Sequence, residues 1–160
     1  LQVGADKVAV NTAALETPDL IAKIASRFGA QCVIASIDAR RAPAGGYEVY
    51  TRSGTTATGK DPVALAREVE KAGAGEILLT SVERDGTLEG YDLDLTRRVS
   101  EAVSIPVIAS GGAGTAEHMA QAVLEGKASA VAAASCYTFT QLTPLEVKRH
   151  LASRGIAVRL

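Results

Sequence analysis

The glycine-rich stretch at residues 110–114 is the part of the sequence best suited to binding an anion. It follows the apolar run at 107–109 and precedes residues 115–118, which open a helical pattern. A buried strand that passes through glycines into a helix N-terminus presents backbone N–H groups to a phosphate, and the helix dipole favours negative charge there. The alternative is an ordinary turn that needs glycine for its dihedral angles. This stretch alone leaves both interpretations open.

Polar residues and glycines also follow the other apolar runs of the sequence. The five runs cover residues 7–11, 32–37, 77–81, 107–110 and 130–134. The residues that gather at or just after their ends are Asn11, Thr12, Asp38, Thr80, Ser81, Asp85, Gly86, Ser110, Gly111, Gly112, Ala134 and Ser135. In α/β folds the carboxyl edge of a parallel sheet is where ligands bind. We therefore predict a single site at this edge, built from several loops.

Two carboxylates, Asp38 and Asp85, are the candidates for acid/base chemistry in this site. Asp38 closes the apolar run at 32–37, and its alternative role is to cap the loop that follows. Asp85 comes directly before Gly86, so it can instead form an Asx-type turn with that glycine. For each of the two carboxylates, the residue type alone leaves both the catalytic and the structural role open.

Backbone amides and hydroxyl groups complete the predicted site. Gly86 offers an unhindered N–H group to a phosphate, as do the two glycines after the fourth apolar run, and Ser135 adds a hydroxyl after the fifth. Ala134 contributes its backbone at the same place. Thr80 and Ser81 are expected to line the site with their hydroxyls, although threonine at a buried strand end often has only a structural role.

Helical patterns alternate with the apolar runs and must position these residues. Their expected ranges are 17–28, 62–72, 93–102, 117–124 and 143–152. The first is expected to have Thr17 as N-cap and Pro18 at its first position. Residues 47–50 are expected to form a hairpin arm and residues 53–56 a loop. Strands that alternate with helices give a parallel sheet with right-handed crossovers.

Two architectures fit this order: an open doubly wound sheet and part of a (β/α)8 barrel, or TIM barrel. The last two loops favour the barrel, because the loops after a barrel's final two strands usually form its phosphate site. We therefore predict an α/β fold with five parallel βα units, a partial (β/α)8 barrel, in one domain over residues 1–160. Residues 1–5 are expected to be the last turn of a helix that began upstream, with Gly4 as its cap.

Composition limits the expected partners and location. The 160 residues are 47% hydrophobic and carry a formal net charge of −1, so no nucleic acid partner is expected. No run approaches the length of a membrane span and no signal peptide opens the sequence, so we expect a cytoplasmic protein. Cys32 and Cys136 are expected to be reduced core residues. His118 and His150 are expected to be solvated surface residues on helices, without metal-ligand spacing, and neither a metal nor a cofactor is expected.

Several motifs resemble the cyclase subunit of imidazole glycerol phosphate synthase, a family of histidine biosynthesis with a closely related sister isomerase. The motifs are Gly4-Ala5-Asp6-Lys7-Val8, Asn11-Thr12-Ala13-Ala14, Ser36-Ile37-Asp38-Ala39-Arg40, the stretch 73–81, Arg84-Asp85-Gly86-Thr87, Gly90-Tyr91-Asp92 and the stretch 109–114. The resemblance implies a (β/α)8 barrel of about 250 residues. This sequence would match it from the fourth strand onward, without the first three strands, the other catalytic aspartate and half of a two-phosphate site.

The resemblance also implies the chemistry. The family's cyclase adds ammonia from a glutaminase partner to a ribulosyl aminoimidazole nucleotide with two phosphates, and makes imidazole glycerol phosphate and an aminoimidazole carboxamide nucleotide. Asp38 would be one of two catalytic carboxylates, and Asn11 and Thr12 would belong to the phosphate site opposite the glycines. Three residues at strand starts would face the glutaminase, or else be ordinary surface charges: Asp6, Lys7 and Glu76.

Two classes of function follow from the resemblance. The first is an enzyme fragment that keeps Asp38 and one phosphate site, and is weak or inactive alone. The second is an assembly module that self-associates, or captures an N-terminal half-barrel, through exposed strand edges. A third interpretation is an independent phosphosugar-binding protein or isomerase. No feature of the sequence requires it.

Overall fold

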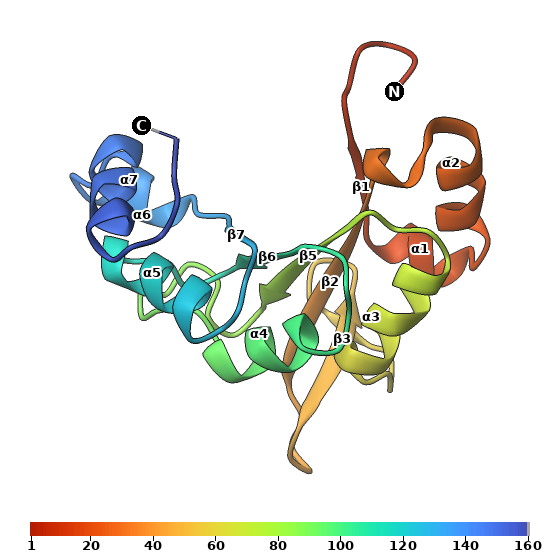
Figure 1. Cartoon of the computed structure of the whole chain (residues 1–160). Coiled ribbons are helices and arrows are strands. Elements are labelled where there is room, and N and C mark those ends of the chain that lie inside the picture. The colour runs from red at the N-terminus through yellow and green to blue at the C-terminus, as the bar shows by residue number, and fades with distance from the viewer. Residues whose placement is uncertain (160) are drawn as a thin grey trace.

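The computed structural model describes residues 1–159 and is built around a curved, mostly parallel sheet (Figure 1). The parallel strands are β1 (Val8–Val10), β2 (Val33–Arg41), β5 (Glu76–Ser81), β6 (Val107–Ser110) and β7 (Ala130–Val131). Each pairs with the next in this order. Among the described residues, β1 and β7 do not pair with each other, so the sheet is not closed. The predicted α/β fold with five parallel βα units is confirmed, and it is consistent with a partial TIM barrel.

An antiparallel hairpin extends the sheet beyond the end of β1. It consists of β3 (Tyr47–Thr51) and β4 (Thr56–Ala57), and β3 pairs with β2 from Asp38 opposite Tyr50 to Arg41 opposite Tyr47. The prediction that the second strand stops before Asp38 is therefore wrong. The strand continues to Arg41 because the hairpin supplies hydrogen-bond partners for its backbone.

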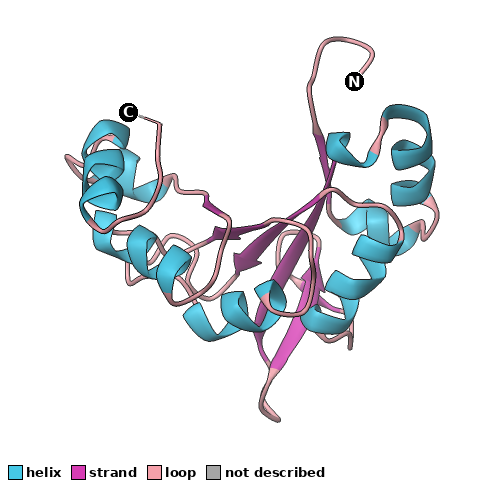
Figure 2. Ribbon diagram, in the orientation of Figure 1, coloured by secondary structure: helices cyan, strands magenta, loops and turns pink. Residues whose placement is uncertain are grey.

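Helices cover the convex side of the sheet (Figure 2). They are α1 (Thr12–Glu16), α2 (Leu20–Phe28), α3 (Pro62–Lys71), α4 (Leu93–Ser100), α5 (Ala116–Leu124), α6 (Ser135–Phe139) and α7 (Pro144–Ser153), with a 3-10 turn η1 at Ala30–Cys32. Four of them begin at a residue whose side chain accepts a hydrogen bond from the N–H three residues on, and these caps are Asp61, Asp92, Thr115 and Thr143. Among the described residues, no helix is long and apolar enough to cross a membrane.

The chain around α1 differs from the prediction. Thr17 is the C-cap of α1, where its N–H donates to the Ala13 carbonyl at 2.9 Å, and α2 starts only at Leu20. The expected N-cap at Thr17 is therefore wrong. Residues 1–4 form a single turn closed by a 3.3 Å bond from the Gly4 N–H to the Leu1 carbonyl, rather than the end of an α-helix.

The last strand is also shorter than predicted. β7 pairs with β6 only at Ala130 and Val131, and the Ala132 N–H makes one further bond, to the Ala109 carbonyl at 2.8 Å. Beyond Ser110 the β6 chain turns away through glycines with positive φ, so residues after Ala132 have no strand beside them. The chain then enters the short helix α6, which the sequence did not indicate.

The central strands alternate between two environments. Val33, Ala35, Ile37 and Ala39 of β2 are buried on the helix side, whereas Asp38 is only half-buried on the other. β5 and β6 show the same alternation. Strands covered on both faces would be apolar throughout, so this pattern identifies the concave face as the one without helices.

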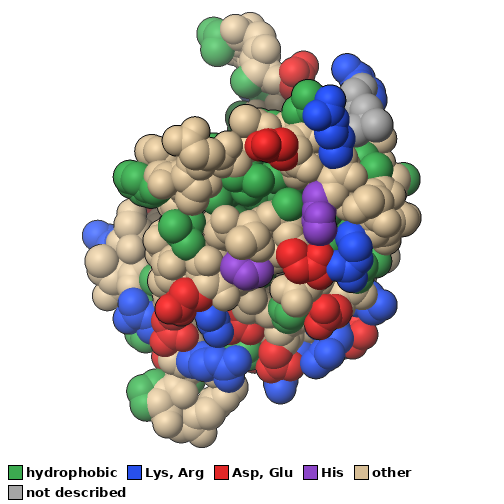
Figure 3. Space-filling view, turned by 90° about the vertical axis from the view of Figure 1, so that its left-hand side faces the viewer, with side chains coloured by type: hydrophobic (Ala, Val, Ile, Leu, Met, Phe, Trp, Pro, Cys, Tyr) green, Lys and Arg blue, Asp and Glu red, His purple; other side chains and the backbone are tan. Residues whose placement is uncertain are grey.

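The helix side holds two hydrophobic clusters. The first packs α2, α3 and α4 against the sheet around Ile37, Ile77 and Leu95. The second lies among α5, α6 and α7 and includes Met119 and Cys136. Cys136 is therefore a core residue as predicted, while Cys32 is half-buried, and both thiols are free. Seen from the side of the C-terminal helices, Figure 3 shows hydrophobic side chains in a hollow in the upper middle of the face, with most of the acidic and basic side chains below it.

Candidate functional site

Three polar side chains form a row at the carboxyl edge of the sheet. Asp38 of β2 is the pairing partner of Thr80 of β5, and Thr80 is the partner of Ser110 of β6. Paired residues of neighbouring strands lie about 4.8 Å apart and point to the same face. The structure thus brings together three of the predicted site residues, on the concave face of the sheet, opposite the helices (Figure 2).

A pocket of about 340 Å³ lies over this row. Its lining consists of Asp38, Ser53, Thr80, Val82, Asp85 and Ser110. Burial raises the pKa of the Asp38 carboxyl, a hydrogen bond with the Asn11 side chain opposes that rise, and the charge of Asp85 adds to it. A carboxyl whose pKa is raised in this way keeps its proton at a higher pH than an exposed aspartate, which suits a group that both gives and takes protons.

A second pocket of about 160 Å³ adjoins the first and shares Asp85 and Ser110 with it. Its lining consists of Asp85, Gly86, Ser110, Gly111, Gly112, Ala113, Ala132, Ala133, Ala134 and Ser135. These residues come from the loops after β5, β6 and β7, and they include all the glycines predicted to bind phosphate. Within residues 1–159, the N–H groups of Gly86, Gly111 and Gly112 donate to no backbone or side-chain acceptor. Free amides of this kind are what an anion requires.

Close packing between loops explains why glycine is needed after β6. Gly112 has φ +102°, and a Cβ there would lie 2.2 Å from the Gly90 carbonyl oxygen. Gly111 has φ +88°, and its Cβ would lie 2.6 Å from the Ser81 carbonyl oxygen. The structural reason for these glycines is therefore sufficient by itself, and anion binding remains a separate prediction. A Cβ on Gly86 would meet no atom within 4 Å, but its φ of +79° also favours glycine.

Three other predicted site residues lie outside both pockets. Asn11 Nδ2 donates to the Ser36 carbonyl at 3.2 Å, and Thr12 Oγ1 donates to Asn11 Oδ1 at 3.1 Å and accepts from the Arg52 N–H at 3.0 Å. Ser81 is 4% exposed on the helix side of β5, so its hydroxyl lines neither pocket. Its carbonyl instead accepts from the N–H groups of residues 84 and 85 and shapes the loop that carries Asp85.

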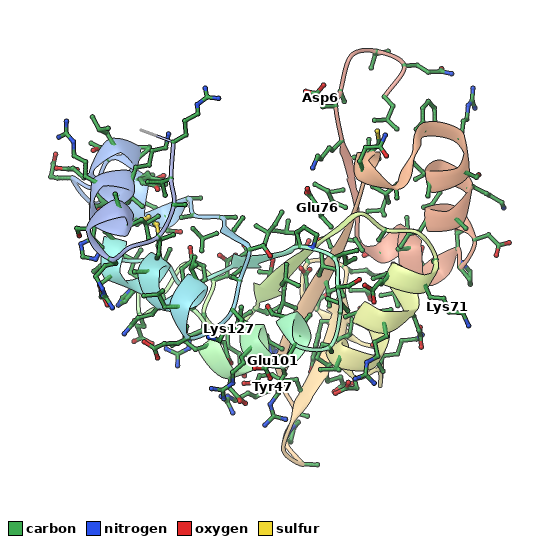
Figure 4. The ribbon with its side chains drawn as sticks, viewed as in Figure 1. Asp6, Tyr47, Lys71, Glu76, Glu101 and Lys127 are labelled. Carbon is green, nitrogen blue, oxygen red and sulfur yellow. The ribbon has the colours of Figure 1, made fainter. Side chains whose placement is uncertain are left out.

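The predicted partner residues lie at the opposite edge of the sheet. Lys7 Nζ and Glu76 Oε1 form an ion pair that links the starts of β1 and β5, and Asp6 is exposed beside it. Figure 4 shows Asp6 and Glu76 near each other, on the side of the molecule where the ribbon is open. The length of β5 separates this group from Thr80 and the two pockets.

Sequence reasoning missed residues that reach the site from loops. Ser53 lines the Asp38 pocket because Tyr50 of β3 pairs with Asp38, which brings the turn of the hairpin to this pocket. Tyr91 donates to the Ala132 carbonyl at 2.9 Å. His118, expected to be a solvated surface residue, is half-buried and accepts from the Gly114 N–H at 3.2 Å through Nδ1.

Over residues 1–159, no group of three or more His, Cys, Asp or Glu is placed to hold a metal ion.

The chain was compared with models of protein families. A family model described as "histidine biosynthesis protein" matches residues 1–142. The matched range includes every residue that lines the two pockets, as well as the Lys7–Glu76 pair. The helix α7 lies beyond it.

Proposed function

Because the chain belongs to the histidine biosynthesis protein family, we propose that it supplies a phosphate site and a catalytic carboxylate to a cyclase of that pathway. The proposed reaction adds ammonia to a ribulosyl aminoimidazole nucleotide with two phosphates and gives imidazole glycerol phosphate and an aminoimidazole carboxamide nucleotide. The observation that carries the proposal is the pair of adjoining pockets, one with a half-buried carboxyl and one with free glycine amides. A phosphate in the second pocket would place the rest of its molecule over Asp38.

Asp38 is the proton carrier in this proposal. In its protonated form it donates one proton to the ketose oxygen, which takes a second proton from the attacking ammonia nitrogen and leaves as water when the imine forms. The resulting carboxylate accepts a proton when the imidazole ring closes. Asp85 assists from the shared wall of the two pockets, and the hydroxyls of Thr80 and Ser110 orient the substrate between them.

The two phosphates of the substrate have separate sites in the proposal. One is held by the amides of Gly86, Gly111 and Gly112 and by the backbone and hydroxyl of residues 134 and 135. The other approaches Asn11 and Thr12. Both of those side chains are already hydrogen-bonded within the protein, so this second site needs groups from outside the described sheet.

Ammonia would enter at the other edge of the sheet. The Lys7–Glu76 pair and the exposed Asp6 give that edge a cluster of charges suited to docking a glutaminase subunit. We also propose a cytoplasmic location, which the two free thiols support.

A specific observation favours assembly with a further chain as a second function. Among residues 1–159, β1 and β7 each have one edge without a partner strand, and an apolar pocket adjoins each of them. The pocket of about 390 Å³ beside β1 is lined by Leu1, Gln2, Val3, Val8, Ile24, Arg27 and Phe28. The pocket of about 520 Å³ beside β7 includes Met119, Val131, Tyr137, Val147 and Leu151. Such edges bind other strands, so we propose that activity requires a complementary set of βα units.

Mixing the chain with the three-strand N-terminal half of a family member tests both parts of the proposal. We expect imidazole glycerol phosphate to form from the nucleotide and ammonium only in the mixture, and Asp38→Asn to abolish its formation. Phosphorus NMR of inorganic phosphate added to the chain alone should show binding. Strong turnover by the chain alone would contradict the requirement for a second half. A mixture that assembles but shows no turnover would contradict the proposed cyclase activity.

A further inference from the structure

We propose that Tyr91 is a positioning residue that holds two walls of the glycine-lined pocket together. The inference rests on the proposed function, because that pocket is the one assigned above to phosphate. Tyr91 itself lines neither pocket. It lies in the loop after β5, while the walls that it would hold belong to the loops after β6 and β7.

The contact with the β7 loop is made by the phenol of Tyr91. Its Oη donates to the carbonyl of Ala132 at 2.9 Å, and the residue is only 5% exposed. Burial raises the pKa of Tyr91, so the hydroxyl keeps its proton and remains a donor throughout the physiological range. Ala132 is the first of the four consecutive residues, 132–135, that form this wall of the pocket.

The contact with the β6 loop is made by the preceding residue. The N–H of Gly90 donates to the carbonyl of Gly112 at 2.7 Å. The two backbones are so close that a Cβ on Gly112 would lie 2.2 Å from the Gly90 oxygen. Two consecutive residues, Gly90 and Tyr91, therefore hold the two loops from the same side.

The β7 loop has few other attachments at this point. β7 is two residues long, and its backbone bonding to β6 ends with the Ala132 N–H. The next backbone bond on this segment is from the Tyr137 N–H to the Ala134 carbonyl, within the turn that opens α6. The phenol of Tyr91 is thus the side-chain contact that holds the Ala132 carbonyl where the wall begins, and losing it should loosen the chain between the Ala132 N–H and the Ala134 carbonyl.

Removing the hydroxyl alone tests the inference. Tyr91→Phe keeps the ring, and Tyr50→Phe is the matched control, because Tyr50 lies in β3 of the hairpin and lines neither of the two pockets. Calorimetry with inorganic phosphate should show a dissociation constant at least about fivefold higher for Tyr91→Phe, since a lost hydrogen bond has an effect of this size. The control should bind as the unsubstituted chain does. Amide hydrogen exchange at residues 133–135 should accelerate only in Tyr91→Phe.

The outcomes separate the inference from the proposed function. If the unsubstituted chain binds phosphate and Tyr91→Phe binds it equally well, with unchanged exchange, the positioning role is wrong and the phosphate site stands. If the unsubstituted chain binds no phosphate, the phosphate site is wrong and the inference falls with it. A Tyr91→Phe protein that does not fold would also contradict the inference. That result would show that the hydroxyl stabilises the whole molecule and not only the wall of the pocket.

Discussion

The half-buried carboxyl of Asp38 is less stable in its ionised form in the folded chain than it would be in water. Burial has the largest effect on its pKa, and the nearby Asp85 carboxylate acts in the same direction. The folded state therefore binds the Asp38 proton more tightly than the unfolded state does. Catalytic groups are often held in such unfavourable surroundings, so removing the charge should increase stability and abolish activity.

The substitution Asp38→Asn tests this at two pH values. Because the pKa is raised on folding, the stability contributed by Asp38 is complete below the ordinary value of 3.8 and is lost as pH rises through the folded value. We expect Asp38→Asn to raise the free energy of unfolding in urea at pH 7.5, and to change it little at pH 3.5. Asp19→Asn, at an exposed position, is the control. An Asp38→Asn protein less stable than the parent at pH 7.5 would contradict the argument.

The row of Asp38, Thr80 and Ser110 could be predicted from the sequence because each residue lies near the end of an apolar run or just after it. The sequence could not show which of two adjacent hydroxyls belongs to the row. Neighbouring residues of a strand point to opposite faces, so only one of Thr80 and Ser81 can line the pocket, and the choice depends on the register of β5 with β2. Ser53 and Tyr91 were missed because loops bring them in, and loop paths leave no periodic signal.

At the scale of elements, one carboxylate joins the hairpin to α4. Asp92 is 7% exposed, and its Oδ1 accepts from the Leu95 N–H at 3.0 Å, which caps the helix, and from Tyr47 Oη at 2.8 Å. Arg41, from the extended end of β2, lies 3.7 Å from the other oxygen. The residue that begins α4 thus also fixes the base of the hairpin whose turn reaches the Asp38 pocket.

Replacing this buried cap should lower the free energy of unfolding more than replacing an exposed cap does. Asp92→Ala removes the cap and leaves the buried Tyr47 hydroxyl with only its longer bond, 3.4 Å to Asp94 Oδ2, so we expect a loss of about 3 kcal/mol in the free energy of unfolding. Asp61→Ala, which removes the exposed cap of α3, should cost about 1 kcal/mol. Urea unfolding of the two variants measures both values. Equal losses would show that the Tyr47 contact adds nothing.

Helices with their own start signals were predictable, and those without them were not. The starts of α3, α4, α5 and α7 lie within one residue of the expected positions, because a capping side chain precedes each of them. The short helices α1 and α6 have no side-chain cap. At five residues each they are too short for an amphipathic period to stand out, and tertiary contacts decide whether they form.

At the scale of the molecule, the two unpaired strand edges determine how the 160-residue polypeptide behaves in solution. We expect light scattering to give a mass that exceeds that of the monomer and increases with concentration, because open edges next to apolar pockets attract other strands. A lysine at the exposed position 9 of β1, as Ala9→Lys, should reduce this association. Ala13→Lys, at an exposed position of α1, should not. A monomer at every concentration would contradict the prediction.

The order of the five βα units was predictable because the helical and strand periods alternate clearly along the sequence. The curvature was inferred only indirectly, from the loops after the last two strands. The shape of a sheet depends on the twist between neighbouring strands and on the helices packed against it. Neither of these can be derived from any single segment of the sequence.

The walls of the glycine pocket are made largely of main chain, whereas the row beside it is made of side chains. A main-chain anchor is insensitive to most amino-acid replacements, provided that the glycines remain. Under the proposed function, point mutations in the row can therefore alter the chemistry performed on the rest of a molecule without disturbing the site proposed to hold its phosphate. In such an architecture, a lineage can acquire activity on a new phosphorylated metabolite by changing a few residues around Asp38, because the proposed phosphate site is kept.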